Sequence, residues 1–326
     1  MRPLASRRPI IGIIAASWLA LMISEPVMSN TTTSVSSGRE PHCAGRFDFA
    51  LPADLRTGGR EESLYLVRVW SEAVSPSADP TEVWTHHTAP LRQAQGSMQP
   101  PRLQRDLTLP GVGPAALYRA VATVMPGAPE ESKFLAMKPF PGHVVFLEAS
   151  VSPGREPVAA EVISEIAGAY SPASANGFCV AHGAFLLPPS KNERARSAFE
   201  GMGGVSVSLA TETVAAPMPA STSEDTADTA AALAADGGRL DVLLRRERAA
   251  AGLLGHELRL AVSDKEAVQN GGDPELIYTW IFPGESADGL RPRVRLAASA
   301  PAARRTELDS AWEMLLSSLK QRASPH

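Results

Sequence analysis

Hydrophobic and polar positions alternate over many short stretches of the chain, which is the pattern of half-buried β-strands. The stretches that read as strands are 46–51, 64–70, 134–138, 143–151, 205–214, 240–248, 257–262, 276–282 and 294–297. Turn-forming residues separate two of the pairs, at Pro139 to Gly142 and at Pro283-Gly284. The small residues at 249–256 predict a long or bulged turn between two further strands. The chain is therefore expected to be rich in antiparallel hairpins.

Two other stretches repeat their apolar residues with a helical period. Residues 156–169 follow this period after Pro157, a residue type that suits the first turn of a helix. Residues 306–322 carry the apolar stripe Leu308, Trp312, Leu315, Leu316 and Leu319, and Thr306 with Asp309 suits a capping box. By contrast, 85–110 and 215–228 are polar and contain proline, so both are expected to be surface connections, the second of them mobile.

The arrangement of these elements predicts an α+β fold with two domains. Residues 171–177 form a break in composition (SPASANG), and we place the domain boundary there. The expected domains are 43–172 and 177–322, each a mostly antiparallel sheet packed with one or two helices. A flexible Ser/Thr-rich lead-in is expected at 30–42.

The N-terminus has the features of a secretory signal peptide. Three arginines and no acidic residue stand in the first nine positions. The apolar run 10–23 follows, and then Val27 and Ser29 provide small side chains at positions −3 and −1 of a cleavage site. The apolar run is short for a membrane-spanning helix. We predict cleavage after Ser29 and a periplasmic protein with no membrane span in its mature form. An uncleaved anchor is the alternative, and Arg7-Arg8 leaves both the general secretory and the twin-arginine route open.

Composition excludes several classes of protein. Of 326 residues, 44% are hydrophobic and 20% charged, which is too apolar for a disordered chain. A formal net charge of −4 provides no basic field for nucleic acid, so no nucleic-acid partner is expected. Two cysteines are too few for a disulfide-dense scaffold or a zinc site built from cysteines.

The predicted export determines the redox environment of the two cysteines. Cys43 and Cys179 would face an oxidising compartment, where a pair of cysteines is expected to form a disulfide. Two buried free thiols are one alternative. A reactive cysteine beside a histidine is the other, since His42 precedes Cys43 and His182 follows Cys179 by three positions.

Sequence motifs for catalysis are missing or weak. The chain has no Gly-x-Ser-x-Gly elbow, phosphate-binding loop, dinucleotide fingerprint or His-Glu-x-x-His helix. Ser317 and Lys320 fit Ser-x-x-Lys by letter alone, His86-His87 suits a polar loop better than a metal site, and Glu257 after His256 lacks a nearby nucleophile. We therefore predict no catalytic, cofactor-binding or metal-binding residues, and a function in binding.

Several short motifs follow one another in a defined order along the chain. They are Cys43-Ala44-Gly45-Arg46-Phe47, Gly177-Phe178-Cys179-Val180, the segment 252–257, the strand around Trp280, the segment 312–318 and Arg322. This succession, from about 43 to 322, resembles a family of two-domain periplasmic immunity proteins, whose members protect bacteria from phospholipase toxins delivered by type VI secretion. The chain departs from the pattern at His256, where an acidic residue is expected, and in an Ala/Ser-rich insertion at 215–236.

The resemblance implies a stoichiometric inhibitor rather than an enzyme. Its two domains would clamp a cognate lipase effector and block access of substrate to the active site. A Cys43–Cys179 disulfide would then fix the angle between the domains. The residues that contact the effector are unknown, although 85–110 and 215–228 are candidate recognition loops. A periplasmic adaptor or carrier is the alternative function, and an exported hydrolase is less favoured.

Overall fold

The computed structural model describes residues 38–93, 101–121, 130–217, 223–285 and 289–324. The predicted signal peptide, most of the predicted lead-in and part of the predicted loop at 215–228 lie outside these segments. The folded part begins before Cys43, because strand β1 (Arg39–Ala44) includes residues at the end of the predicted lead-in.

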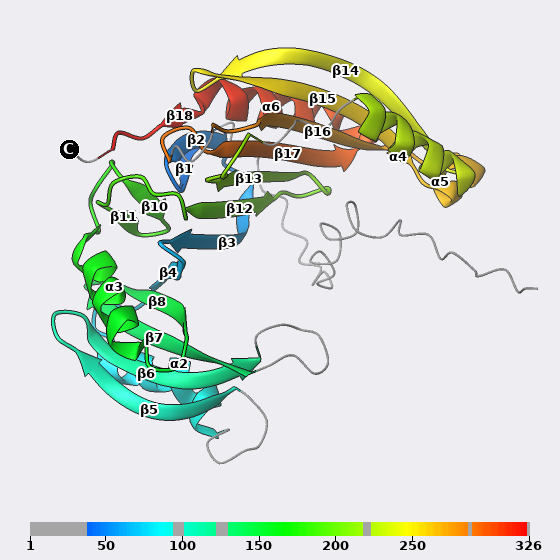
Figure 1. Ribbon diagram of the computed structural model, residues 1–326. Helices are drawn as coiled ribbons and strands as arrows, with labels where there is room; N and C mark the ends of the chain where they lie inside the picture. Colours follow the sequence, from blue (N-terminus) through cyan, green and yellow to red (C-terminus); the bar gives the residue numbers. More distant parts are fainter. Residues whose placement is uncertain (1–37, 94–100, 122–129, 218–222, 286–288, 325–326) are drawn as a thin grey trace, which may run out of the picture. The chain divides into compact units, whose positions relative to one another are not determined.

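A twelve-stranded antiparallel sheet forms the centre of the described structure (Figure 1). In spatial order its strands are β14 (Arg239–Ala250), β15 (Leu253–Ser263), β16 (Glu275–Phe282), β17 (Arg293–Pro301), β13 (Ser206–Glu212), β12 (Arg194–Glu200), β3 (Arg56–Leu64), β4 (Val67–Ala73), β8 (His143–Val151), β7 (Glu130–Phe140), β6 (Gly113–Val121) and β5 (Arg102–Leu109).

Two three-stranded sheets and several helices complete the described elements. One small sheet contains β1, β2 (Phe47–Pro52) and β18 (Lys320–Gln321), and the other contains β9 (Tyr170–Ser171), β10 (Phe178–Val180) and β11 (Gly183–Phe185). The helices are α2 (Pro80–Gln93), α3 (Glu156–Gly168), α4 (Ser223–Ala235), α5 (Lys265–Asn270), the short 3₁₀ helix η1 (Ala302–Arg304) and α6 (Arg305–Ser318). The predicted α+β class is confirmed.

Elements with a clean hydrophobic period are found where the sequence predicts them. The hairpins β7–β8 and β16–β17, the strand β13 and the helix α3 match their predicted stretches closely. In α3, Ile163, Ile166 and Ala167 form the buried stripe. In β13, buried and partly exposed residues alternate without a break. Periodicity therefore identified the elements that bury one regular face.

The prediction of a surface connection at 85–110 is wrong. Helix α2 occupies 80–93 and buries Trp84, Thr88 and Leu91, although Pro90 and several polar residues obscure this stripe in the sequence. Strand β5 occupies 102–109, and its alternation is interrupted because its pairing with β6 shifts register between Leu103 and Arg105. A proline inside a helix and a bulge inside a strand concealed both elements.

The prediction of a long turn at 249–256 is also wrong. Strand β14 continues to Ala250 and β15 starts at Leu253, so only Ala251 and Gly252 form the turn, both with positive φ. Gly255 lies within β15, where a Cβ atom would overlap the indole ring of Trp280. This glycine is required for close packing rather than for a turn.

Three smaller predictions need correction. The predicted strand 64–70 spans a tight turn, because Tyr65 and Leu66 have positive φ and separate β3 from β4. Helix α6 has Arg304 at its N-cap without a side-chain cap, so Thr306 and Asp309 form no capping box. The predicted loop at 215–228 ends earlier than expected, since α4 begins at Ser223.

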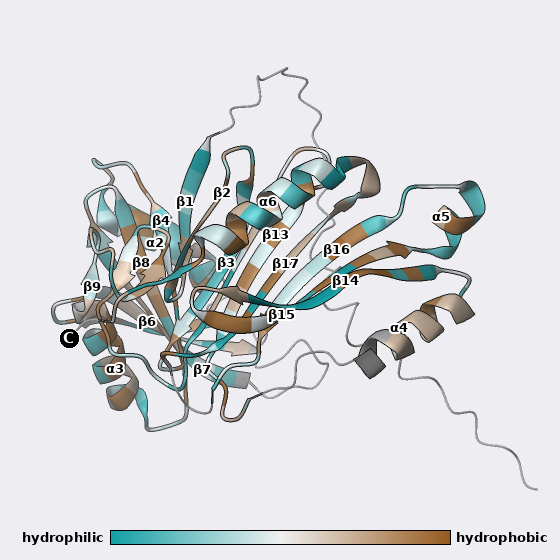
Figure 2. Cartoon of the chain, turned by 90° about the horizontal axis from the view of Figure 1, so that it is seen from above, coloured by the Kyte–Doolittle hydropathy of each residue, from teal (hydrophilic) through white to brown (hydrophobic). Residues whose placement is uncertain are grey.

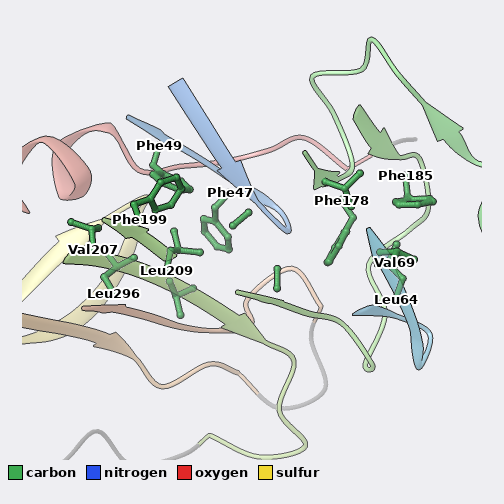
Figure 3. Close-up of a cluster of buried hydrophobic side chains, with 14 of the residues drawn as sticks. Phe47, Phe49, Leu64, Val69, Phe178, Phe185, Phe199, Val207, Leu209 and Leu296 are labelled. Atoms are coloured by element: carbon green, nitrogen blue, oxygen red, sulfur yellow. The ribbon is translucent and has the colours of Figure 1, made fainter. Parts of the chain in front are cut away.

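Two clusters of buried side chains form the core. The smaller lies beside α2, and the larger includes residues of β4, β6, β7, β8 and α3 together with one face of the β14-to-β3 part of the sheet. Trp280, Tyr278 and Leu296 on this face are fully buried, as is Trp312 of α6, which lies over the strands (Figure 2). Strands β1 and β2 cover the neighbouring part of the same face. Phe49 of β2 packs edge-to-face against Phe199 of β12, with ring centroids 5.7 Å apart (Figure 3).

Strand β3 connects the two halves of the large sheet, β14 to β12 on one side and β4 to β5 on the other. Strand β3 pairs with β12 on one side and with β4 on the other, so it joins strands from the first and second halves of the sequence. The division into domains at 172–177 remains a prediction. None of the helices in the described segments is both long enough and apolar enough to cross a membrane.

Candidate functional site

The two cysteines meet where the first strand of the described structure contacts the second half of the chain. Cys43 in β1 and Cys179 in β10 are joined by a disulfide, with Cα atoms 6.1 Å apart and a sequence separation of 136. The backbone amide of Cys179 also donates to the carbonyl of Gly45 at 2.7 Å. A covalent bond and a backbone bridge thus fix β10 against β1.

An ion pair that the sequence analysis missed reinforces this junction. Arg46 donates from Nε and Nη2 to the carboxylate of Glu193 at 2.8 and 2.7 Å, and from Nη2 to the carbonyl of Leu187 at 2.9 Å. Both side chains are almost fully buried. Because Arg46 and Glu193 are 147 positions apart, local sequence gives no signal of their pairing.

The C-terminal residue of the proposed family motif takes part in the same junction. Arg322 pairs with Asp48 of β2 at 2.6 Å and donates to the carbonyl of Ser174 at 2.9 Å. The backbone amide of Arg322 donates to the carbonyl of Arg46 at 2.9 Å. The predicted boundary segment at 171–177 is therefore attached to both β2 and the C-terminal end of the chain.

A histidine and tyrosine cluster lies beside the disulfide. Tyr170 Oη donates to the carbonyl of His182 at 2.6 Å and lies 2.9 Å from His143 Nε2, which leaves that ring nitrogen as the donor to the hydroxyl. Burial raises the pKa of Tyr170 to about 12. Cys43, His143, His182 and Arg322 line an open depression of about 520 Å³.

Ser71 and His182 are the described residues that most resemble a nucleophile and its base. Ser71 Oγ lies 3.0 Å from His182 Nδ1 and also accepts from the backbone amide of His182 at 3.1 Å. Burial, then the charges of His143 and Arg60, lower the pKa of His182, so its imidazole is neutral near pH 7. The backbone hydrogen bond joins β4 to the segment before β11, which gives this pair a structural role.

The weaker candidates for metal binding and base catalysis are placed in structural roles. His87 stacks on Phe146 with ring centroids 4.1 Å apart, and Asp79 accepts from the amide of Thr81 at the start of α2. Within the described residues, no group of three or more His, Cys, Asp or Glu side chains is arranged to hold a metal ion.

Glu257 is the centre of a buried charge network rather than a residue of a turn. Its carboxylate accepts from Trp312 Nε1, Arg246 Nε and Arg259 Nε, each at 2.8 Å. Burial acts to raise the pKa of Glu257, but these hydrogen bonds outweigh it and bring the pKa to about 2. The ionised carboxylate therefore connects α6 to β14 and β15.

Comparison with known proteins identifies the fold. No protein-family model matches the chain, and no match was found among curated proteins. The structure is similar to a chain of the Tle4–Tli4 complex, with a TM-score of 0.67 and 17% identity over 88% of this chain and 98% of that one.

It is also similar to the type VI secretion immunity protein TplEi from Pseudomonas aeruginosa. Two TplEi structures match, the apo form and the complex with an "L" peptide, each with a TM-score of 0.64 and 18% identity. The match covers 98% of the apo chain and 99% of the chain in the complex. The match covers 88% and 89% of this chain in the two cases.

The chain therefore has the same fold as the immunity protein TplEi and as the matched chain of the Tle4–Tli4 complex. The fold expected from the motif resemblance is confirmed.

Proposed function

We propose that this protein is a periplasmic immunity protein that binds and inhibits a cognate type VI secretion phospholipase or lipase. The observation that supports it most is a fold shared with type VI immunity proteins over almost the whole length of those proteins. A likeness over 88% of this chain, rather than over one motif, favours a common mode of action.

The internal architecture supports inhibition by binding. The buried ion pairs, the disulfide and the tyrosine–histidine cluster connect elements that are distant in sequence, and so they make the scaffold rigid. A rigid surface loses little conformational entropy when it binds a partner. Tight neutralisation of a toxin requires this property, together with an interface of about 1,600 Å² or more.

The proposed mechanism is a clamp built on either side of the disulfide junction. Strands β4 to β8 with α2 and α3 form one arm, and strands β12 to β17 with α6 form the other. The effector would be held between them, with its active site closed to substrate. The disulfide between Cys43 and Cys179 would maintain the angle between the arms, and oxidation would occur after export through the predicted signal peptide.

The test is survival of bacteria that express the candidate effector in the periplasm. The candidate would be a lipase with a Gly-x-Ser-x-Gly elbow encoded by a gene adjacent to that of this protein. We expect lysis or growth arrest when the lipase is expressed alone, and growth when this protein is exported with it. A version that lacks residues 1–29 is the matched control and should not protect. Equal growth with and without the exported protein would contradict the proposal.

A further inference from the structure

One face of the β12–β13–β17 region is buried, and the other is open. Along β13 and β17 every second residue is buried under β1, β2 and α6, and the residues between them are partly exposed. The partly exposed positions on these strands include small residues such as Ser208, Ala210 and Ala297. Small side chains leave room for larger neighbours, or for a partner, to approach the sheet.

Arginines gather around this small-residue region. The strand register places Arg196 and Arg295 on either side of Ala210, and Arg194 and Arg293 on either side of Glu212. Directly paired residues point to the same face of an antiparallel sheet, so all four arginines stand on the open face. Ser63 lies between Arg194 and Arg68 of β4 in the same way. We call Arg68, Arg194, Arg196, Arg293 and Arg295 the basic band.

Positive charge exceeds negative charge in the basic band. The acidic residues paired directly with its members are Glu61, Glu148 and Glu212, three carboxylates against five guanidinium groups. Burial and then the charges of Arg293 and Arg196 lower the pKa of Arg295, which shows that the cations are close together. Arg196, Arg293 and Arg295 have further contacts within the chain, so the argument depends on the excess of charge and not on any unpaired group.

An apolar strip adjoins the basic band on the same face. Leu260 of β15 pairs with Val242 of β14 on one side and with Ile277 of β16 on the other, and Leu258 lies two residues before Leu260. Val242 is 50% exposed, and the other three are partly exposed. Strand β17 is two strands from β15, and Leu258 is aligned through Thr279 of β16 with Ala297, two residues from Arg295 on the same face.

We propose that this open face is the docking surface for the effector protein, and that it receives an acidic side chain or loop against the basic band and an apolar side chain against the strip. This inference rests on the proposed function and specifies the chemistry of its partner. Arginine is enriched among the residues that contribute most to binding, and the core of an interface is more apolar than its polar rim. The charge excess would accelerate association with an acidic surface and make it sensitive to salt.

The experiment compares the binding kinetics of four proteins to the candidate lipase, in which the nucleophilic serine is replaced by alanine. Wild-type protein, the double variant Arg196→Glu/Arg295→Glu, the strip variant Val242→Asp and the control Arg304→Glu/Arg305→Glu are measured at 50 and 500 mM salt. The control makes the same change of charge at the start of α6, on the opposite face of the sheet. Circular dichroism melting identifies variants that fail to fold, and Arg196→Gln/Arg295→Gln replaces a double variant that melts early.

We expect the band variant to associate at least tenfold more slowly than wild type at 50 mM salt and to lose most of its salt dependence. Val242→Asp in the apolar strip should weaken binding at least tenfold as well, mainly through faster dissociation. The α6 control should bind within threefold of wild type. Wild-type rates in both the band and the strip variants would overturn this inference and leave the proposed function intact. No binding by the wild-type protein would instead contradict the proposed function.

Discussion

Two buried carboxylates, Glu193 and Glu257, each join different elements of the chain through hydrogen bonds to their oxygens. Glu193 connects the segment before β12 to Arg46, between β1 and β2. Glu257 connects β15 to β14 through Arg246 and to α6 through Trp312. Burying a charge is costly unless partners compensate for it, so each network is sensitive to loss of one member.

Glu257→Gln should make the protein less stable at neutral pH. The folded pKa of about 2 lies below the ordinary value for a glutamate, so the ionised carboxylate stabilises the folded state above about pH 4.5. That contribution is lost as the pH falls toward 2. We expect the variant to lose about 2–3 kcal/mol of unfolding free energy at pH 7, and the difference from wild type to shrink between pH 5 and pH 2.5 in urea titrations.

Glu313→Gln is the matched control for this charge. Glu313 belongs to the same network, through Arg248 and Arg259, but its side chain is 50% exposed. Water screens such a pair, so its loss should cost less than about 1 kcal/mol. Equal losses in the two variants would contradict the central role given to Glu257.

Arg46→Met should destabilise the disulfide junction. The substitution leaves Glu193 buried without its guanidinium partner, and we expect a loss of about 3 kcal/mol in chemical denaturation. Arg194→Met removes the exposed partner of Glu212 and should cost less than about 1 kcal/mol. Restoring stability in the double variant Arg46→Met/Glu193→Gln would show that the uncompensated carboxylate causes the loss.

At the scale of helices and strands, the sequence predicts the elements whose apolar residues repeat regularly and does not predict those whose repeat is interrupted. Helix α3 and the hairpin β7–β8 follow from their apolar spacing because one whole face of each is buried. Helix α2 was missed since Pro90 and polar residues mask its buried stripe, and β5 was missed since a bulge breaks its alternation. The pairing of β3 with β12 brings together residues more than 130 positions apart and leaves no local signal.

Gly255→Ala tests the close packing of Gly255 against Trp280, in a stretch for which the sequence predicts a turn. The added Cβ would overlap the indole of Trp280 in a fully packed part of the core. We expect a loss of about 1–3 kcal/mol, measured by thermal or chemical unfolding. Gly59→Ala is the control, because a Cβ at Gly59 in β3 has open space around it. That substitution should change stability by less than about 1 kcal/mol, in either direction.

The candidate site was only partly accessible to sequence reasoning. Export and the count of two cysteines were enough to propose the pairing of Cys43 with Cys179. The side chains around them were not accessible, because Arg46, Tyr170 and His182 find their partners through the tertiary fold. The basic band is invisible in the sequence for the same reason, since strand register alone brings Arg196 and Arg295 together.

For the molecule as a whole, the disulfide should matter for both stability and recognition. Cys43→Ser with Cys179→Ser removes a cross-link between residues 136 positions apart, and chain entropy sets an upper limit of about 5 kcal/mol on the loss of stability. If the disulfide orients the arms of the clamp, small-angle scattering should show a broader distribution of sizes, and effector affinity should fall. Unchanged affinity and scattering would contradict this role.

The central claim is that the protein neutralises a lipase by binding it, without turnover. The most direct measurement is a titration of the candidate lipase with this protein while phospholipid hydrolysis is followed. We predict that activity falls linearly and reaches its minimum at one molecule of this protein per lipase. Full lipase activity in the presence of a tenfold molar excess would contradict the claim.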